Sequence, residues 1–399
     1  MGALWKASNA WDEAFFKELL KLPVFPFYQL IRQDRDQAGE QVNRWLKQEI
    51  APTFSYPTAR HFDVLGYLEA VETCRARLPK DPAWIRQLYE EKLDELRLRA
   101  SLVLAIANAD DQTVTHLSTK LFGLPRQDAD ELEKEFACML DHAERFHEHT
   151  APVQASMFAN MVKDLLDHYD IRGWKVTLSS RSSVRITRGR RARKPVIRIP
   201  TALAISKARA ARLLTHEIEV HALRTENGRR SPLHILHIGL SGYVRTDEGL
   251  AMHFQQQLAK KAPRHAPGFW DAWTCALTQQ GTFADTFNTI ATAKTRLAEA
   301  MGIQETEAIG QDAAWRLCKR AYRGITNTDT YGVGFLRDHL YRSGLLDVRD
   351  LIEENGQNAL HDLFIGNIGI DDARRLEGHN LPSARIPELM SKMIVKKHA

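Results

Sequence analysis

The chain has 399 residues, of which 44% are hydrophobic and 26% are charged, the proportions of an ordinary globular protein. Its 55 basic and 50 acidic residues leave a formal net charge of only +5, so the chain as a whole is no polycation and its partners must be argued from local charge. The four cysteines form no C-x-x-C pair, which argues against a disulfide framework and against a thiolate zinc site.

The N-terminal stretch is interrupted by Asp12, Glu13 and Lys17, so it lacks the continuous apolar run of a signal peptide. No segment approaches the roughly 18 uncharged apolar residues that a membrane span needs. We therefore expect a cytoplasmic protein with no membrane partner.

Residues 11–146 have the pattern of helices joined by proline-containing turns. Leu132, Phe136 and Leu140 recur every four residues, which places an apolar stripe on one helix face. Nothing in this part suggests chemistry. We interpret residues 1–150 as a helical N-terminal region.

In the next three short segments, the hydrophobic pattern changes from the helical period to the alternation of strands. Residues 174–179, 183–188 and 195–199 are β-branched and alternating, as strands are. The last two are joined by 189–194, which we interpret as a hairpin turn. A small sheet is therefore expected just before the helix that contains His216, and the edge of such a sheet is suited to hold an extended peptide.

The predicted hairpin is strongly basic, with Arg185, Arg188, Arg190, Arg191, Arg193, Lys194 and Arg198. One interpretation is a solvated turn that keeps an edge strand from pairing with other chains. The other is a collar that attracts acidic substrates. Nucleic acid is not expected as a partner, because no aromatic residue is interleaved for base stacking.

The segment 213–254 contains the chemistry that we consider most informative. His216, Glu217 and His221 lie on one predicted helix, and a turn at Asn227-Gly228 follows. Two imidazoles and a carboxylate can supply three ligands to one Zn²⁺ and leave a fourth position for water. A glutamate directly after the first histidine is then placed to accept a proton from that water.

The spacing of the two histidines is an objection to this interpretation. On a regular helix, residues five apart point roughly 140° away from each other, whereas residues four apart differ by about 40°. A single-turn π-bulge would bring the pair together. Two undistorted pairings remain open, Glu217 with His221 and His216 with Glu219.

A further carboxylate, Glu248, follows Thr246, which we interpret as the N-cap of a second helix. Glu248 could simply complement the helix dipole there. However, Gly249 and Ala251 are small and would let another segment pack closely beside it. Glu248 is therefore our candidate for the third ligand.

The chain is again helical after residue 254, apart from a Gly/Thr-rich passage at 324–334. We predict an α+β fold that is mainly helical, with a small sheet beside the zinc-binding helix. Residues 151–399 would form a zinc metallopeptidase-like catalytic domain with a helical C-terminal part.

These motifs resemble those of the microtubule-associated tyrosine carboxypeptidase family, whose bacterial members are known as flavohaemoglobin-expression-modulating QEGLA-motif proteins. The family's H-E-x-x-x-H motif matches residues 216–221, so the five-residue spacing is a signature of the family, and its E-G-L-A element matches 248–251. Arg323-Gly324 and the F-x-x-D-x-x-Y-x-x-G run at 335–344 are also similar to the family pattern.

The resemblance implies a zincin-like core and specific roles for four residues. His216, His221 and Glu248 would bind one Zn²⁺ per chain, and Glu217 would be the catalytic base. The characterised branch of the family removes a C-terminal tyrosine from α-tubulin, but a bacterial-type chain need not share that substrate.

We therefore expect a zinc metallocarboxypeptidase that removes a C-terminal residue, with a preference for Tyr or Phe. Its substrate would be a peptide or protein C-terminus, and an acidic one if the hairpin attracts it. A terminal carboxylate needs a cation, for which Arg323 is the first candidate and Arg224 the second. Tyr341 is a candidate donor to the developing oxyanion.

Two alternatives remain open. One is a non-catalytic regulatory or scaffold protein that keeps the zinc fold and binds an acidic partner through the hairpin. The other is a zinc endopeptidase or amidase that has the same site without a carboxylate pocket. The sequence does not identify the natural substrate or the oligomeric state.

Overall fold

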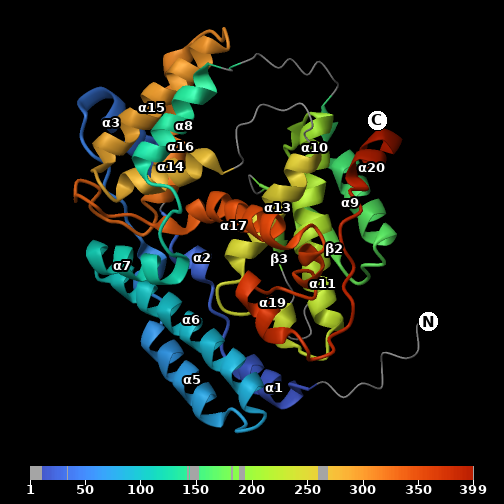
Figure 1. Ribbon diagram of the computed structural model, residues 1–399. Helices are drawn as coiled ribbons and strands as arrows, with labels where there is room; N and C mark the ends of the chain where they lie inside the picture. Colours follow the sequence, from blue (N-terminus) through green and yellow to red (C-terminus); the bar gives the residue numbers. More distant parts are fainter. Residues whose placement is uncertain are drawn as a thin grey trace.

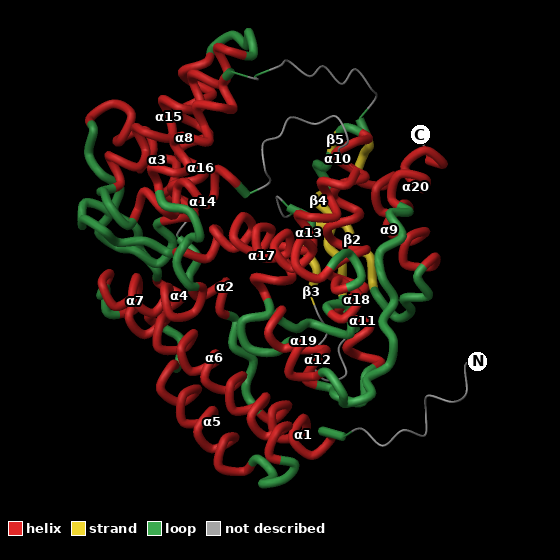
Figure 2. The backbone as a smooth tube through the Cα atoms, viewed as in Figure 1, coloured by secondary structure: helices red, strands yellow, loops and turns green. Residues whose placement is uncertain are grey.

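A computed structural model of the chain describes residues 11–33, 35–141, 143, 152–180, 183–187, 194–258 and 268–398. The described part is mainly helical with two small sheets (Figure 1 and Figure 2). This agrees with the predicted α+β class. Every described helix is too short or too polar to cross a membrane.

The N-terminal helices are connected by short turns, as the proline pattern predicts. They are α1 (Glu13–Lys21), α2 (Phe27–Leu30), α3 (Arg35–Gln48), α4 (Pro57–Arg60), α5 (Val64–Arg77), α6 (Ala83–Ala107), α7 (Asp111–Phe122) and α8 (Ala129–Leu140). Aspartates cap several of them: the side chains of Asp63, Asp110 and Asp128 each accept a backbone N–H in the first turn of the helix that follows. In α8 the predicted stripe is buried at Leu132 and Phe136.

The three predicted strands form one sheet in the order β2-β4-β3. These are β2 (Lys175–Ser179), β3 (Arg185–Thr187) and β4 (Val196–Pro200). The central strand β4 is parallel to β2 and antiparallel to β3, and it buries Ile197 and Ile199. A separate two-stranded sheet pairs β1 (Val153–Gln154) with β5 (Ala204–Ile205).

The tip of the basic hairpin, 188–193, lies outside the described residues. Arg188, Arg190, Arg191 and Arg193 are among them, so the choice between an edge-protecting turn and an acidic-substrate collar stays open. The antiparallel pairing of β3 with β4 does confirm that the two strands flanking this segment are neighbours.

The helices around the predicted metal site follow the sheet. They are α9 (Ala155–His168), α10 (Lys207–Leu214), η2 (Thr215–Ala222), α11 (Leu223–Arg230), α12 (Ile235–Ile238) and α13 (Val244–Leu258). The elements α10, η2 and α11 are continuous in the chain, and η2 is a π-helix.

Two local predictions are wrong. Asn227-Gly228 is no turn but lies inside α11, where a Cβ on Gly228 would come within 2.4 Å of the Leu236 carbonyl oxygen. That glycine therefore permits a close approach of two segments. Thr246 is not an N-cap, because α13 begins at Val244, and the Thr246 hydroxyl instead accepts the backbone N–H of Ile370 at 3.2 Å.

The C-terminal part consists of further helices. They are α14 (Phe269–Thr278), α15 (Phe283–Ala300), α16 (Thr306–Ala321), the 3₁₀-helix η3 (Leu336–His339), α17 (Leu340–Asn355), α18 (Ala359–Asp362), α19 (Ile370–Leu376) and α20 (Ser391–His398). Helix α20 returns to pack against α9 and α10 (Figure 1). The C-terminal helix therefore supports α10, which leads directly into η2.

Two large hydrophobic cores account for most of the buried apolar side chains among the described residues. The first unites the N-terminal helices with residues 233–240 and with apolar residues between 269 and 340. The second begins at Val153 and joins α9, the β2-β4-β3 sheet, η2 and part of α13. The first core thus draws on both halves of the chain, and the division into 1–150 and 151–399 stays a prediction.

Helices α13 and α17 pack unusually closely beside Glu248. A Cβ on Gly249 would lie 2.2 Å from the carbonyl oxygen of Gly344 in α17. Ala251, two residues farther along the chain, is fully buried. Gly249 therefore allows the close packing that the sequence predicts beside Glu248, whereas Ala251 is part of the second core.

We expect Gly249→Ala to lower the free energy of unfolding by about 1–3 kcal/mol, because the added methyl group must separate α13 from α17. The substitution otherwise favours helix by about 1 kcal/mol. Chemical denaturation in the presence of a chelator measures the difference without any contribution from bound metal. An equal or higher stability of the variant would contradict the close packing.

Candidate metal centre

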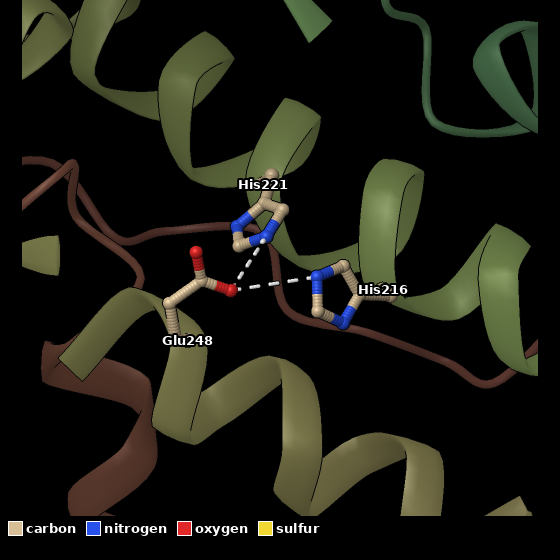
Figure 3. A group of neighbouring side chains, drawn as sticks. All are labelled: His216, His221 and Glu248. Atoms are coloured by element: carbon tan, nitrogen blue, oxygen red, sulfur yellow. Dashed lines mark ion pairs between the residues drawn. The ribbon is translucent and has the colours of Figure 1, made fainter. Parts of the chain in front are cut away.

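Three side chains converge between η2 and α13. Nε2 of His216 lies 3.5 Å from Oε2 of Glu248, and Nε2 of His221 lies 3.6 Å from the same oxygen. Figure 3 shows both imidazoles reaching from one helix toward the carboxylate on the other. The three ligand atoms all lie within 4.8 Å of one another. The structure thus brings together the three residues that we predicted as metal ligands.

The π-helical form of η2 explains how histidines five residues apart can converge. Its wider i→i+5 turn returns residues five apart to nearly the same face, and the two rings lie 4.6 Å apart between centroids. The local widening proposed from the sequence is therefore confirmed.

The alternative pairing of His216 with Glu219 is wrong. Glu219 is fully buried on another side of η2. Its carboxylate accepts hydrogen bonds from the Tyr169 hydroxyl at 2.8 Å, the Thr215 hydroxyl at 2.7 Å and the backbone N–H of Met390 at 2.8 Å. A buried carboxylate needs such partners, and these three engage it away from the histidines.

The electrostatics of the centre favour an ionised carboxylate. His216, His221 and Glu248 are 9%, 8% and 7% exposed. Burial alone would raise the pKa of Glu248, but the imidazoles of His216 and His221 and the guanidinium of Arg337 hold the pKa of that carboxyl well below its usual range. Burial opposes the charging of His221, yet Asp247 and Glu248 raise the pKa of His221 to about 10.

Glu217 is partly buried beside the two histidines. Burial raises the pKa of Glu217 above its ordinary value, while the charges of His216 and His221 act in the opposite direction. A raised carboxyl pKa moves the group toward the range in which a general base works near neutral pH.

The donor set fits a cation. Oε2 of Glu248 is buried and has no hydrogen-bond partner within the described part of the chain. It faces two imidazole nitrogens at distances too long for hydrogen bonds, and a buried polar atom left in this way calls for a missing partner. Two histidines and one carboxylate are the set that holds catalytic zinc in several peptidases.

A further carboxylate, Asp247, lies beside His221. Oδ2 of Asp247 lies 2.9 Å from Nδ1 of His221, and the other oxygen of Asp247 accepts from Nη1 of Arg224 at 2.6 Å. Such a carboxylate fixes the ring orientation of a metal-binding histidine. Asp247 was not among the residues predicted for the site. Its place directly before Glu248 is the signal that would have suggested this role.

Arg224 does not suit the substrate-binding role considered for it. Its side chain has no exposed surface. Besides Asp247, its guanidinium donates to the backbone carbonyls of Leu363 at 3.0 Å and Ile368 at 2.6 Å. Arg224 is therefore a buried residue that holds Asp247 in place.

A residue that was not predicted for the site lies against Glu248, the predicted third ligand. Arg337, in η3, donates from Nη2 to Oε1 of Glu248 at 3.1 Å. Nη1 of Arg337 is also 3.4 Å from the Tyr341 hydroxyl. Tyr341 thus lies one side chain away from the carboxylate, whose charge raises the pKa of Tyr341. Only the position of Arg337 within the 335–344 run pointed toward it.

Arg323 belongs to the same charged neighbourhood. Its guanidinium carbon lies 5.7 Å from the centre of the Phe335 ring. Its charge also helps to lower the pKa of Asp338, a buried carboxyl paired with Arg337. The predicted carboxylate binder is therefore partly buried near Arg337, but no contact joins it directly to the three ligands.

The chain is similar in sequence to known proteins. The family model described as microtubule-associated tyrosine carboxypeptidase matches residues 44–262 and 282–385. The chain belongs to this family. The match includes both segments of the His216–His221–Glu248 group and the segment that carries Arg337.

Two curated relatives carry the name of the microtubule-associated tyrosine carboxypeptidase family. The protein named microtubule-associated tyrosine carboxypeptidase 1 in Homo sapiens is 31% identical over 185 residues, which are 45% of this chain and 35% of the relative. The protein of the same name in Rattus norvegicus is 28% identical over 187 residues, with the same coverage. The alignment thus spans about a third of the length of these relatives.

We expect metal binding to depend on all three converging residues. With zinc as the probe, His216→Ala, His221→Ala and Glu248→Ala should each lose most of the roughly one equivalent bound by the parent chain. Elemental analysis after dialysis measures the ratio. His237→Ala is the matched control, because this partly buried histidine contacts the Thr225 carbonyl at 3.4 Å instead of the centre. Full zinc retention in the Glu248 variant would remove that residue from the ligand set.

Proposed function

We propose that the protein is a zinc-dependent metallocarboxypeptidase that removes a C-terminal residue, preferably Tyr or Phe, from a peptide or protein. His216, His221 and Glu248 would bind one Zn²⁺, and Glu217 would act as the base. The core around η2 and α13 would then be zincin-like. The cysteines at 74, 138, 275 and 318 form no disulfide with one another, which is compatible with the cytoplasmic setting that we propose.

One observation carries this proposal. Nε2 of His216 and Nε2 of His221 face Oε2 of Glu248 at 3.5 and 3.6 Å, and this oxygen has no hydrogen-bond partner within the described residues. Membership of the tyrosine carboxypeptidase family supports the type of reaction and the aromatic preference.

The residues of the chain suggest how the reaction would proceed. A zinc ion bound at such a site supplies Lewis acidity, which polarises a carbonyl group and makes water easier to deprotonate. Glu217 would accept the proton of the attacking water and then donate it to the leaving amine, an effect typically worth about 10²–10⁴ in rate. Tyr341 would donate a hydrogen bond to the developing oxyanion.

The loss of catalysis in Glu217→Gln separates an enzyme from a zinc-containing scaffold. The amide keeps the size of the side chain but cannot accept the proton, so kcat should fall by about 10²–10⁴ while zinc content is unchanged. Mass spectrometry of peptides that end in free Tyr or Phe measures the release of one residue. Equal turnover by the parent chain and the variant would contradict the role of Glu217, and a parent chain without turnover would favour the regulatory alternative.

Recognition of the terminal carboxylate separates a carboxypeptidase from an endopeptidase or amidase. We expect Arg323→Gln to lower kcat/KM for free-carboxylate peptides by about 10- to 100-fold, the worth of a hydrogen bond to a charged group. Amidation of the same peptides should abolish their cleavage by the parent chain, which provides the control. Equal cleavage of free and amidated peptides would support the endopeptidase alternative, and an Arg323 variant with full activity would exclude that residue.

A further inference from the structure

The two oxygens of Glu248 have different surroundings. Oε2 faces the imidazoles of His216 and His221, whereas Oε1 accepts a hydrogen bond from Nη2 of Arg337 at 3.1 Å. A carboxylate can bind a metal ion through one oxygen or through both. A guanidinium on Oε1 favours binding through Oε2 alone, because turning both oxygens toward the cation would break this charge-assisted bond.

Arg337 is itself held on several sides. Its Nε donates to the Tyr28 hydroxyl at 3.0 Å, and its Nη1 donates to Oδ1 of Asp338 at 3.0 Å. Its guanidinium carbon also lies 5.4 Å from the ring centre of Tyr28 and 5.7 Å from that of Tyr341. Cation–π contacts and directed hydrogen bonds together restrict the guanidinium to one position. The side chain is 16% exposed, which limits its freedom further.

Tyr28 comes from a distant part of the chain. It belongs to the short helix α2 in the N-terminal region, 309 positions before Arg337. It also precedes residue 44, where the match to the family model begins. Tyr28 is 40% exposed, so its ring is not needed to fill a core. The hydroxyl of an exposed tyrosine thus contacts Arg337, which in turn contacts Glu248.

We propose that Arg337, fixed in place by Tyr28, is a positioning residue that keeps Glu248 bound to the metal through Oε2 only. The N-terminal region thereby takes part in building the metal centre. This inference rests on the proposed metal site, and it adds a role for two residues that the reaction itself does not use. Keeping Oε1 away from the metal leaves a coordination position for water or substrate.

Metal binding tests the inference without any substrate. We expect Arg337→Gln to weaken zinc binding by about 10- to 100-fold, the usual cost of losing a partner of a metal-binding residue. Tyr28→Phe, which removes only the hydroxyl, should weaken zinc binding by about fivefold, the worth of one hydrogen bond. Competition with a chromophoric chelator measures both affinities. Arg86→Gln is the matched control, because Arg86 also holds a carboxylate, that of Glu90 at 2.8 Å, but lies on α6 away from the centre.

Cobalt provides a readout of how Glu248 binds. If Glu248 in the Arg337 variant binds through both oxygens, the coordination number rises and the visible absorption of bound Co²⁺ weakens relative to the parent chain. A residue that acts only on stability would lower the melting temperature without changing this spectrum. If Arg337→Gln does not fold, Tyr28→Phe carries the same test, since Tyr28 is exposed.

The outcomes separate the two proposals. A parent chain that binds no zinc would contradict the proposed function. A parent chain that binds zinc, with an Arg337 variant of equal affinity and an unchanged cobalt spectrum, would overturn this inference alone. A Tyr28→Phe variant with the zinc affinity of the parent chain would show that Arg337 keeps its position without the Tyr28 hydroxyl. The N-terminal region would then have no part in building the metal centre.

Discussion

The proposed metal centre depends on one backbone constraint, the π-helical widening of residues 215–222. Because the chain runs from α10 into α11 without interruption, a regular helix would turn one histidine away from the other. The widening is supported from the side opposite the centre. Glu219 ties it to the Tyr169 hydroxyl and to the backbone of Met390, and the Thr215 hydroxyl lies 2.6 Å from that of Ser391. The C-terminal segment thus stabilises a backbone form that is otherwise rare.

The buried charges near the widened helix are compensated in pairs. The two carboxylates beside His221 are each paired with an arginine, Asp247 with Arg224 and Glu248 with Arg337. Uncompensated burial of such charges would be costly. The pairing therefore preserves a charged, oriented donor set in a region nearly closed to water. Close packing of α13 on α17 at Gly249 and Gly344 brings the second arginine within reach.

The parts of the site that are close together in sequence could be predicted, and the parts that depend on distant segments could not. The H-E-x-x-x-H spacing indicated both the histidine pair and the need for a widened turn, and Glu248 followed from its small neighbours. Arg224 looked available in the sequence, but the fold covers it with Leu363 and Ile368, which lie far along the chain. The Thr246 hydroxyl likewise bonds to Ile370 and not to its own helix. Sequence patterns report which face of a helix is apolar, but they do not report which distant backbone group a buried polar side chain meets.

The position of the centre relative to the two hydrophobic cores has a consequence for cooperativity. Leu336 and Leu340, on either side of Arg337, belong to the first core, while Leu250 and Ala251, next to Glu248, belong to the second. The Arg337–Glu248 contact therefore joins the two cores at the predicted ligand Glu248. A cation that binds more tightly when this contact is formed would stabilise both cores together through thermodynamic linkage. Loosening of either core would in turn weaken the proposed metal binding, so metal affinity would depend on the packing of both cores.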